Sequence, residues 1–259
     1  MIKYFSTFFL FLTLSVNTFS QTNRFGINDM HGAVIPSDIE IYNVDSVAVN
    51  LTQIINKPTL LAFVYYRCPG ICSKVLSNIA ELINKTTLVA GKDYQVIAIS
   101  IHSGEKPSMA KAKRRNYIKM LKNPEFAAGW NFFTADSTTI ARLTNITGFM
   151  FEKRGDDIVH PTALIMITPH GKISQYLYGN FYLPADLEIA VRDANNENVD
   201  VSRVKDVKYC FAKEHPIAKS TMEFIGFTGV IIAVAIFSIV IFLIYRIKVW
   251  QKKQLVAKK

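Results

Sequence analysis

Away from its two ends, this 259-residue sequence carries little net charge. Of the formal net charge of +10, one unit comes from Lys3 and six come from the lysines and arginines after Tyr245, which leaves +3 for the rest of the chain. Proteins that bind nucleic acid through an electrostatic surface carry a basic excess on their folded part. The small net charge of the rest of the chain therefore gives no case for a nucleic-acid partner.

Charge is missing altogether from the run between Phe224 and Tyr245. As a helix, this run would be about 33 Å long, enough to cross a hydrocarbon core of about 30 Å. Acidic residues are missing from 246–259, which carries the six positive charges. Because positive charge stays on the cytoplasmic side, we predict a transmembrane helix at 224–245, a basic cytoplasmic tail at 246–259 and a protein body outside the cytoplasm. A buried core helix is the alternative, and a charge-free run of this length argues against it.

The N-terminal segment has the pattern of a signal peptide. Lys3 precedes an apolar run at 5–16, and small residues follow at Thr18 and Ser20. The apolar run is short for a membrane span, so we predict a signal peptide at 1–20, with an uncleaved anchor as the alternative. The protein is then expected in the cytoplasmic (inner) membrane as a single-pass protein, with its globular domain in the periplasm or an equivalent extracytoplasmic space.

A globular domain is predicted at 28–209, joined to the span by a linker at 210–223, and no internal repeat is visible in it. Apolar runs and alternation indicate strands, and apolar residues at helical spacing indicate helices. The first half is expected to form a strand pair and short helix in 31–54, a buried strand in 57–66, a helix in 69–85, a buried strand in 94–101 and a basic helix in 107–122. The second half is expected to form a strand in 131–135, a helix in 136–149 capped by Asp136 or Ser137, a β-hairpin in 162–179 and a helix from Pro184 to Ala194. This order predicts an α/β fold, a thioredoxin-like sandwich with a late β-hairpin, plus one C-terminal transmembrane helix.

Cysteine is scarce: the chain has three, and two of them lie four positions apart in FVYYRCPGIC, residues 63–72. Cys68 follows the first predicted buried strand, and Cys72 falls in the first turn of the next helix. If both belonged to that turn, residues i and i+4 would share a face, close enough for a disulfide or a shared metal ion. The unpaired N–H groups and the dipole at a helix N-terminus favour thiolate over thiol, so both sulfurs are expected to be reactive.

The spacing of these cysteines bears on their role. The thioredoxin-type redox motif, which has two residues between its cysteines, is missing, because here there are three. A structural disulfide across so short a loop would stabilise little. Two thiolates beside an imidazole suit Cu(I), and His160, just before the predicted hairpin, could be carried over the cysteine-bearing turn. A metal-free disulfide of Cys68 and Cys72, and a hairpin-supporting role for His160, stay open as alternatives.

Five longer segments carry a further signal: GAVIPSDIEI, KPTLLAFVYYRCPGICSKVLSNI, GWNFFTADSTTIARLTNITGF, VHPTALIMITPHGKISQYLYG and YCFAKEHP. In this order along the chain, they resemble the Sco/SenC family of copper-binding, thioredoxin-fold assembly proteins for respiratory cytochrome oxidase. The resemblance covers residues 32–245 and is strongest to a membrane-anchored branch with a C-terminal span. It implies that one copper is bound by the two cysteines of a CxxxC motif and one histidine, which correspond to Cys68, Cys72 and His160. Cu(I) is favoured, with Cu(II) as an alternative.

One pair of residues departs from the family pattern, and one cysteine within a matching segment has no assigned role. The family commonly has an Asp-Pro pair after its second central strand, where this chain has His102 and Ser103. His102 follows a strand end near the same rim as the cysteines, which makes it a candidate auxiliary ligand. Cys210 could be a free thiol or an intermolecular partner, and the resemblance implies no role for it.

The resemblance implies a copper metallochaperone rather than an enzyme. Its task would be to deliver copper to, or prepare the thiols of, the binuclear copper centre of cytochrome c oxidase. The expected partners are the copper-centre subunit of the oxidase, other copper chaperones or thiol reductants, and the membrane. A disulfide between Cys68 and Cys72 would abolish the copper site. The alternative is an extracytoplasmic thiol-disulfide oxidoreductase with incidental copper binding, in which these cysteines are the redox pair and His160 is dispensable. A peroxidase on the same fold is a weaker option, because no peroxide pocket is evident.

Overall fold

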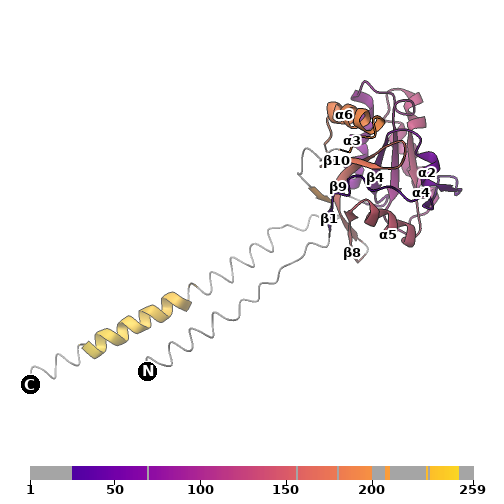
Figure 1. Ribbon diagram of the computed structural model, residues 1–259. Coiled ribbons are helices and arrows are strands. Elements are labelled where there is room, and N and C mark those ends of the chain that lie inside the picture. The colour runs from indigo at the N-terminus through magenta and orange to yellow at the C-terminus, as the bar shows by residue number, and fades with distance from the viewer. Residues whose placement is uncertain are drawn as a thin grey trace, which may run out of the picture. The chain divides into compact units, whose positions relative to one another are not determined.

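The computed structural model describes residues 25–68, 70–155, 157–179, 181–199, 208–210, 232 and 234–250. The chain divides into two compact units, Met1–Ala212 and Lys213–Lys259 (Figure 1). The predicted signal peptide at 1–20 lies outside the described residues. The same holds for residues 211–223 of the predicted linker and 251–259 of the predicted tail.

The first unit is organised around a mixed sheet in which five strands follow one another in the order β10-β9-β4-β5-β6 (Figure 1). The strands are β4 (Thr59–Val64), β5 (Gln95–Ser100), β6 (Trp130–Phe133), β9 (Asp157–Ile167) and β10 (Ile173–Tyr178). The first three are parallel to one another, and β9 runs antiparallel to both β4 and β10. All residues of β4 and β5 are buried, as their continuous apolar sequences predict.

Two hydrophobic cores lie on the two faces of this sheet. Alternate residues of β4 serve each of them: Leu60 and Ala62 pack with one core, and Leu61 and Phe63 pack with the other. The first core is covered by α3 (Ile71–Lys85), α4 (Pro107–Ile118) and α6 (Pro184–Asn195). The second is covered by α5 (Ser137–Ile146) and by α2 (Leu51–Ile54). The α/β sandwich expected from the sequence is therefore confirmed.

The shorter elements complete the unit. These are β1 (Gly26–Ile27), which pairs with β7 (Phe149–Met150), β2 (Glu40–Tyr42), which pairs with β3 (Ala48–Asn50), and the 3-10 turn η1 (Pro124–Gly129). Asp136 is the N-cap of α5, where its side chain accepts a hydrogen bond of 2.8 Å from the Thr139 N–H, so the predicted cap is confirmed for Asp136.

One boundary differs from the sequence-based prediction in a way that matters for the site. The hairpin was expected to begin at Thr162, with His160 ahead of it, but β9 already begins at Asp157. Two further strands, β8 (Glu152–Arg154) and β11 (Lys208–Cys210), pair antiparallel with the first half of β9. These partners satisfy the backbone of that half, so His160 lies inside a paired strand.

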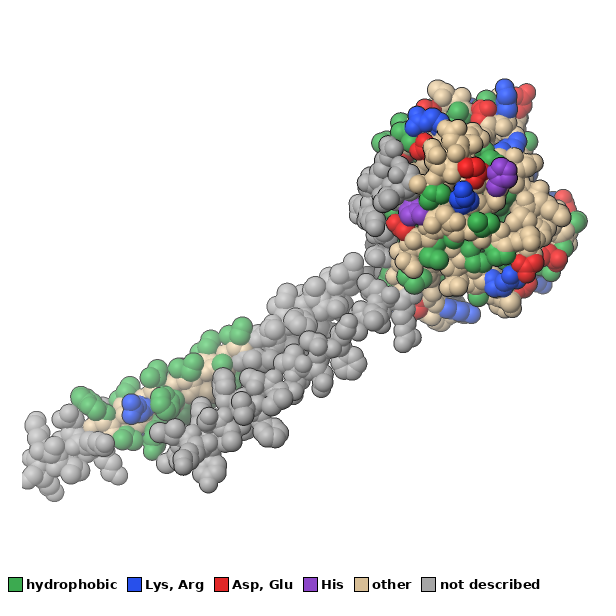
Figure 2. Space-filling model, viewed as in Figure 1, with side chains coloured by type: hydrophobic (Ala, Val, Ile, Leu, Met, Phe, Trp, Pro, Cys, Tyr) green, Lys and Arg blue, Asp and Glu red, His purple; other side chains and the backbone are tan. Residues whose placement is uncertain are grey.

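In the second unit, residues 234–250 are helical, and their large apolar side chains are exposed (Figure 2). On the face of the first unit seen in Figure 2, acidic and basic side chains are interspersed. Within the described part of the chain, no helix combines the length and apolar character needed to cross a membrane. Of the predicted span at 224–245, residues 224–231 and 233 lie outside the described residues.

Candidate metal centre

The three predicted ligands lie in three different parts of the fold. Cys68 lies in the turn that follows β4, Cys72 is the second residue of α3, and His160 is in β9. All three are buried, with 4%, 2% and 2% of their surface exposed. Burial of two thiols and an imidazole at the end of a sheet removes water from around them, which strengthens their interactions with one another and with a cation.

The fold brings Cys72 and His160 into direct contact, although they are 88 residues apart in sequence. The distance from Cys72 Sγ to His160 Nε2 is 3.1 Å. On its other side, the His160 ring has Nδ1 2.8 Å from the carbonyl oxygen of Pro161. A carbonyl oxygen can only accept a hydrogen bond, so Nδ1 carries the proton and donates it. In the neutral ring, Nε2 then keeps its lone pair, and that lone pair faces the sulfur.

The environment of His160 keeps the ring neutral. Burial lowers the pKa of His160 below its ordinary value, and the hydrogen bond to Pro161 and the nearby Cys68 oppose this only in part. The ring also packs against Phe149, with 5.8 Å between the ring centres. A neutral imidazole whose second nitrogen is fixed by a backbone carbonyl is the form in which histidine binds metals.

Cys68 is held differently, because it lies outside the helix. The N-cap of α3 is Gly70, which offers no side-chain cap to the first turn. The shared helical face considered for the two cysteines is therefore not formed. Cys68 is instead placed by a turn in which its N–H donates to the Tyr65 carbonyl at 3.1 Å, and its sulfur accepts from the Gly70 N–H at 3.4 Å.

The two sulfurs nevertheless belong to one small cluster. Cys68, Cys72 and Tyr65 pack together as a separate hydrophobic group next to the two main cores. Among the described residues, no three His, Cys, Asp or Glu side chains already form a group that could hold a metal ion. The chemistry of the donor set, two soft sulfurs and one neutral imidazole, fits copper.

His102 and Ser103 occupy the rim beside this cluster. The His102 ring stacks on the Tyr65 ring, with 5.3 Å between the centres and 13° between the planes. Its Nδ1 accepts the Gly104 N–H at 3.0 Å. Ser103 is exposed. His102 is thus linked to the cysteines through Tyr65, and its role as an auxiliary ligand stays a prediction.

A buried carboxylate also reaches the turn that carries Cys68. Glu105 Oε2 accepts the Tyr66 N–H at 2.8 Å, and Oε1 accepts the Arg67 N–H at 2.7 Å. The hydroxyl of Ser100 donates to Oε2 at 2.6 Å. Nothing in the sequence pattern marks Glu105 as part of the site, except that it is the single acidic residue between Asp93 and Glu125.

The third cysteine lies closer to the site in the fold than its place in the sequence suggests. Cys210 is the last residue of β11, and the antiparallel register sets it opposite His160 in β9. The register therefore puts the backbone of Cys210 next to that of a predicted ligand.

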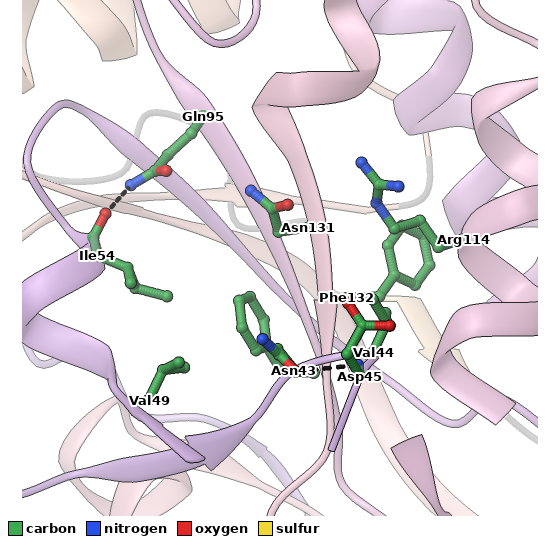
Figure 3. Close-up of a pocket in the computed structure, with 10 residues that line it drawn as sticks. Asn43, Val44, Asp45, Val49, Ile54, Gln95, Arg114, Asn131 and Phe132 are labelled. Carbon is green, nitrogen blue, oxygen red and sulfur yellow. Dashed lines mark hydrogen bonds between the residues drawn. The ribbon is translucent and has the colours of Figure 1, made fainter. Parts of the chain in front are cut away.

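A hollow in the first unit lies away from these residues. It has a volume of about 320 Å³ and is lined by β5, β6, α4 and the β2–β3 segment, including Gln95, Asn131, Arg114 and Asp45 (Figure 3). Arg114 is half-buried and donates to the carbonyls of Trp130 and Ala127, and burial lowers its pKa. None of the predicted metal ligands lines this hollow, so it is separate from the candidate metal centre.

Comparison with known structures identifies the fold. A crystal structure of a protein from Aquifex aeolicus VF5 is similar, with 24% identity, a TM-score of 0.58, and 64% of this chain and 95% of that chain covered. The Arabidopsis thaliana ScoI structure with copper bound has 20% identity and a TM-score of 0.51, over 64% of this chain and 99% of the other. BsSco, described as a member of the Sco family of cytochrome c oxidase assembly proteins with a disulfide switch, has 20% identity and a TM-score of 0.51, over 66% and 98%. A search of curated protein sequences gives no match.

The sheet order, the CxxxC turn at the start of a helix and the histidine in β9 together define a thioredoxin-like protein with a candidate metal centre at one end of its sheet. The model of the SCO1/SenC family matches residues 30–187, which is more than half of the chain. The chain belongs to the SCO1/SenC family. The resemblance noted from the sequence is thus confirmed at the level of the family.

Proposed function

We propose that this protein is a copper metallochaperone that binds one copper ion, preferentially Cu(I), through Cys68, Cys72 and His160. It delivers this copper to, or prepares the thiols of, the binuclear copper centre of cytochrome c oxidase. The observation that carries the proposal is the 3.1 Å contact between Cys72 Sγ and the unprotonated Nε2 of His160. Membership of the SCO1/SenC family and the copper-bound structure of a relative support it.

The choice of metal rests on the donor set. Soft thiolates select Cu(I), and an imidazole is an acceptable third ligand. Structural zinc sites have four protein ligands, and this set offers three. Burial of the donors restricts access to the ion, and a second pair of thiols on a partner could take it by ligand exchange. The copper-centre subunit of the oxidase is the proposed recipient, and other copper chaperones or thiol reductants are the proposed suppliers.

Copper content is expected to follow the oxidation state of the two cysteines. The full-length chain, purified in detergent and reduced, should bind one copper, because both sulfurs are available as thiolates. After oxidation with glutathione disulfide, Cys68 and Cys72 form a disulfide, each sulfur loses its proton, and two molecules of glutathione are released. The oxidised chain should bind no copper.

Metal analysis combined with a thiol count on the same samples checks this prediction. An oxidised chain that keeps one copper after gel filtration would show that the sulfurs are not the ligands. A reduced chain that binds no copper under anaerobic conditions would contradict the proposed function itself.

A thiol-disulfide oxidoreductase is the second candidate. The packing of Cys68 and Cys72 in one buried cluster supports it. This function needs the two sulfurs but not the imidazole. The two candidates therefore differ in what they require of His160.

We also propose that residues 224–245 cross the cytoplasmic membrane and that residues 1–20 are a signal peptide. The support is the charge-free run, the six positive charges after it and the exposure of its apolar side chains from Val234 to Tyr245. The globular unit is then placed in the periplasm or an equivalent extracytoplasmic space.

A reporter fusion is expected to verify this orientation. Alkaline phosphatase, which is active only outside the cytoplasm, should be inactive when fused after Lys259 and active when fused after Val199. A fluorescent protein that folds only in the cytoplasm should give the reverse pattern. Phosphatase activity of the fusion after Lys259 would contradict the orientation and the compartment deduced from it.

A further inference from the structure

Two of the three proposed ligands lie in regular secondary structure, and the third does not. Cys72 is part of α3, and His160 is part of β9, which is paired along its whole length. Cys68 belongs to neither a helix nor a strand. Its place depends on the turn from Tyr65 to Cys68, in which the Cys68 N–H donates to the Tyr65 carbonyl at 3.1 Å.

A carboxylate fills the inside of this turn. The two central residues of the turn, Tyr66 and Arg67, both donate their N–H groups to Glu105, one to each carboxylate oxygen. Two successive N–H groups aimed at one anion form a site that a carboxylate satisfies well. The side chain of Glu105 is 0% exposed, so these two hydrogen bonds are not shared with bulk water.

The carboxylate is itself fixed to the sheet. Ser100 is the last residue of β5, and its hydroxyl donates to Glu105 Oε2 at 2.6 Å. Arg67 Nε lies 3.7 Å from Oε1, but its side chain is 51% exposed, so this ion pair is screened and contributes little. The hydrogen bonds of Glu105 to the turn and to Ser100 therefore fix the turn relative to β5, and the ion pair with Arg67 contributes little to this.

We propose that Glu105 is the positioning residue of the metal centre: it holds Cys68 at the distance from Cys72 that both copper binding and disulfide formation require. This proposal rests on the proposed function for its copper part, while its disulfide part stands without copper. A carboxylate that only stabilised the fold would affect the unfolding temperature and leave the properties of the two sulfurs unchanged.

Glu105→Gln tests the proposal because the amide keeps the size of the side chain and replaces one acceptor by a donor. Either the Tyr66 or the Arg67 N–H then faces an N–H group, and the turn loses that hydrogen bond. In the metal-free full-length chain, equilibrated with glutathione, we expect the Cys68–Cys72 disulfide to become about tenfold less favoured, which corresponds to a reduction potential about 30 mV less negative. The affinity for Cu(I), from competition with a chelator, should fall about tenfold.

Three further variants complete the experiment. Glu81→Gln removes an exposed carboxylate of α3, and Arg67→Ala removes the screened ion pair but keeps the backbone N–H; both should match the wild-type chain. Glu105→Asp keeps the charge and shortens the reach, so it should shift both values in the same direction as Glu105→Gln. If Glu105→Gln does not fold, Glu105→Asp carries the test.

The outcomes separate this proposal from the proposed function. Wild-type values of the potential and of the copper affinity in Glu105→Gln and Glu105→Asp, with only a lower unfolding temperature, would overturn the positioning role. A wild-type chain that binds no copper would overturn the metallochaperone function, and the reduction potential would still decide the role of Glu105.

Discussion

Replacing either Cys68 or Cys72 by serine is expected to lower the copper content of the reduced chain from one ion to none. The hydroxyl group is a hard donor that stays protonated at neutral pH, so it does not replace a thiolate on Cu(I). For Cys72 the structure adds a reason, because this sulfur is the atom that contacts Nε2 of His160. Copper per chain after anaerobic gel filtration measures the effect, and thermal unfolding checks that the variants are folded.

Cys210→Ala is the matched control for these substitutions. It also removes a cysteine, and its backbone is opposite His160 in the antiparallel pair of β11 and β9. The proposed ligand set is complete without it, so copper content should stay at one per chain. Loss of copper in Cys210→Ala would show that the ligand set extends to the third cysteine.

Replacing His160 by alanine is expected to abolish the ability of the protein to support oxidase assembly when copper is limiting. Loss of an outer hydrogen-bonding partner alone costs about 10- to 100-fold in metal affinity, so loss of a ligand should exceed the upper end of that range. The thiols of Cys68 and Cys72 keep their turn and their helix, so their alkylation rate should remain close to that of the wild-type chain. The measurements are Cu(I) competition, alkylation kinetics and oxidase activity in cells that carry the variant as their single copy.

His102→Ala is the corresponding control. His102 is at the same rim and stacks on Tyr65, but its Nδ1 is used by the Gly104 N–H. Oxidase activity should survive this change. If the His160→Ala cells assemble a copper-loaded oxidase under copper limitation, metal delivery is not the function, and the cysteines act as a redox couple.

The helices and strands that carry the site could be predicted from local sequence. The apolar run before Cys68 predicts β4, the apolar spacing after it predicts α3, and Asp136 marks the start of α5, because each of these signals depends only on neighbouring residues. The ligand set of Cys68, Cys72 and His160 comes from residue type, spacing and the family resemblance, and it stays a prediction.

The parts that could not be predicted depend on contacts between distant segments. His160 lies inside β9 because β8 and β11 pair with it, and β11 is separated from it by about 50 residues of chain. Glu105 reaches Tyr66 across 39 positions, and no periodic pattern links the two. A long-range pairing of this kind has no local signature, since it is decided by how the strands and loops pack in the finished fold.

The separation of Cys72 and His160 by 88 residues has a consequence for the order of folding. β9 is late in the sequence and must pair with β4, so this contact closes a long loop and is expected to form late in folding. Until then the chain carries two thiols, one in the turn after β4 and one at the start of α3, with no completed sheet to shield them. Protection of Cys68 and Cys72 from premature oxidation is therefore a property of the finished fold, and a newly made chain depends on reductants around it until β9 is in place.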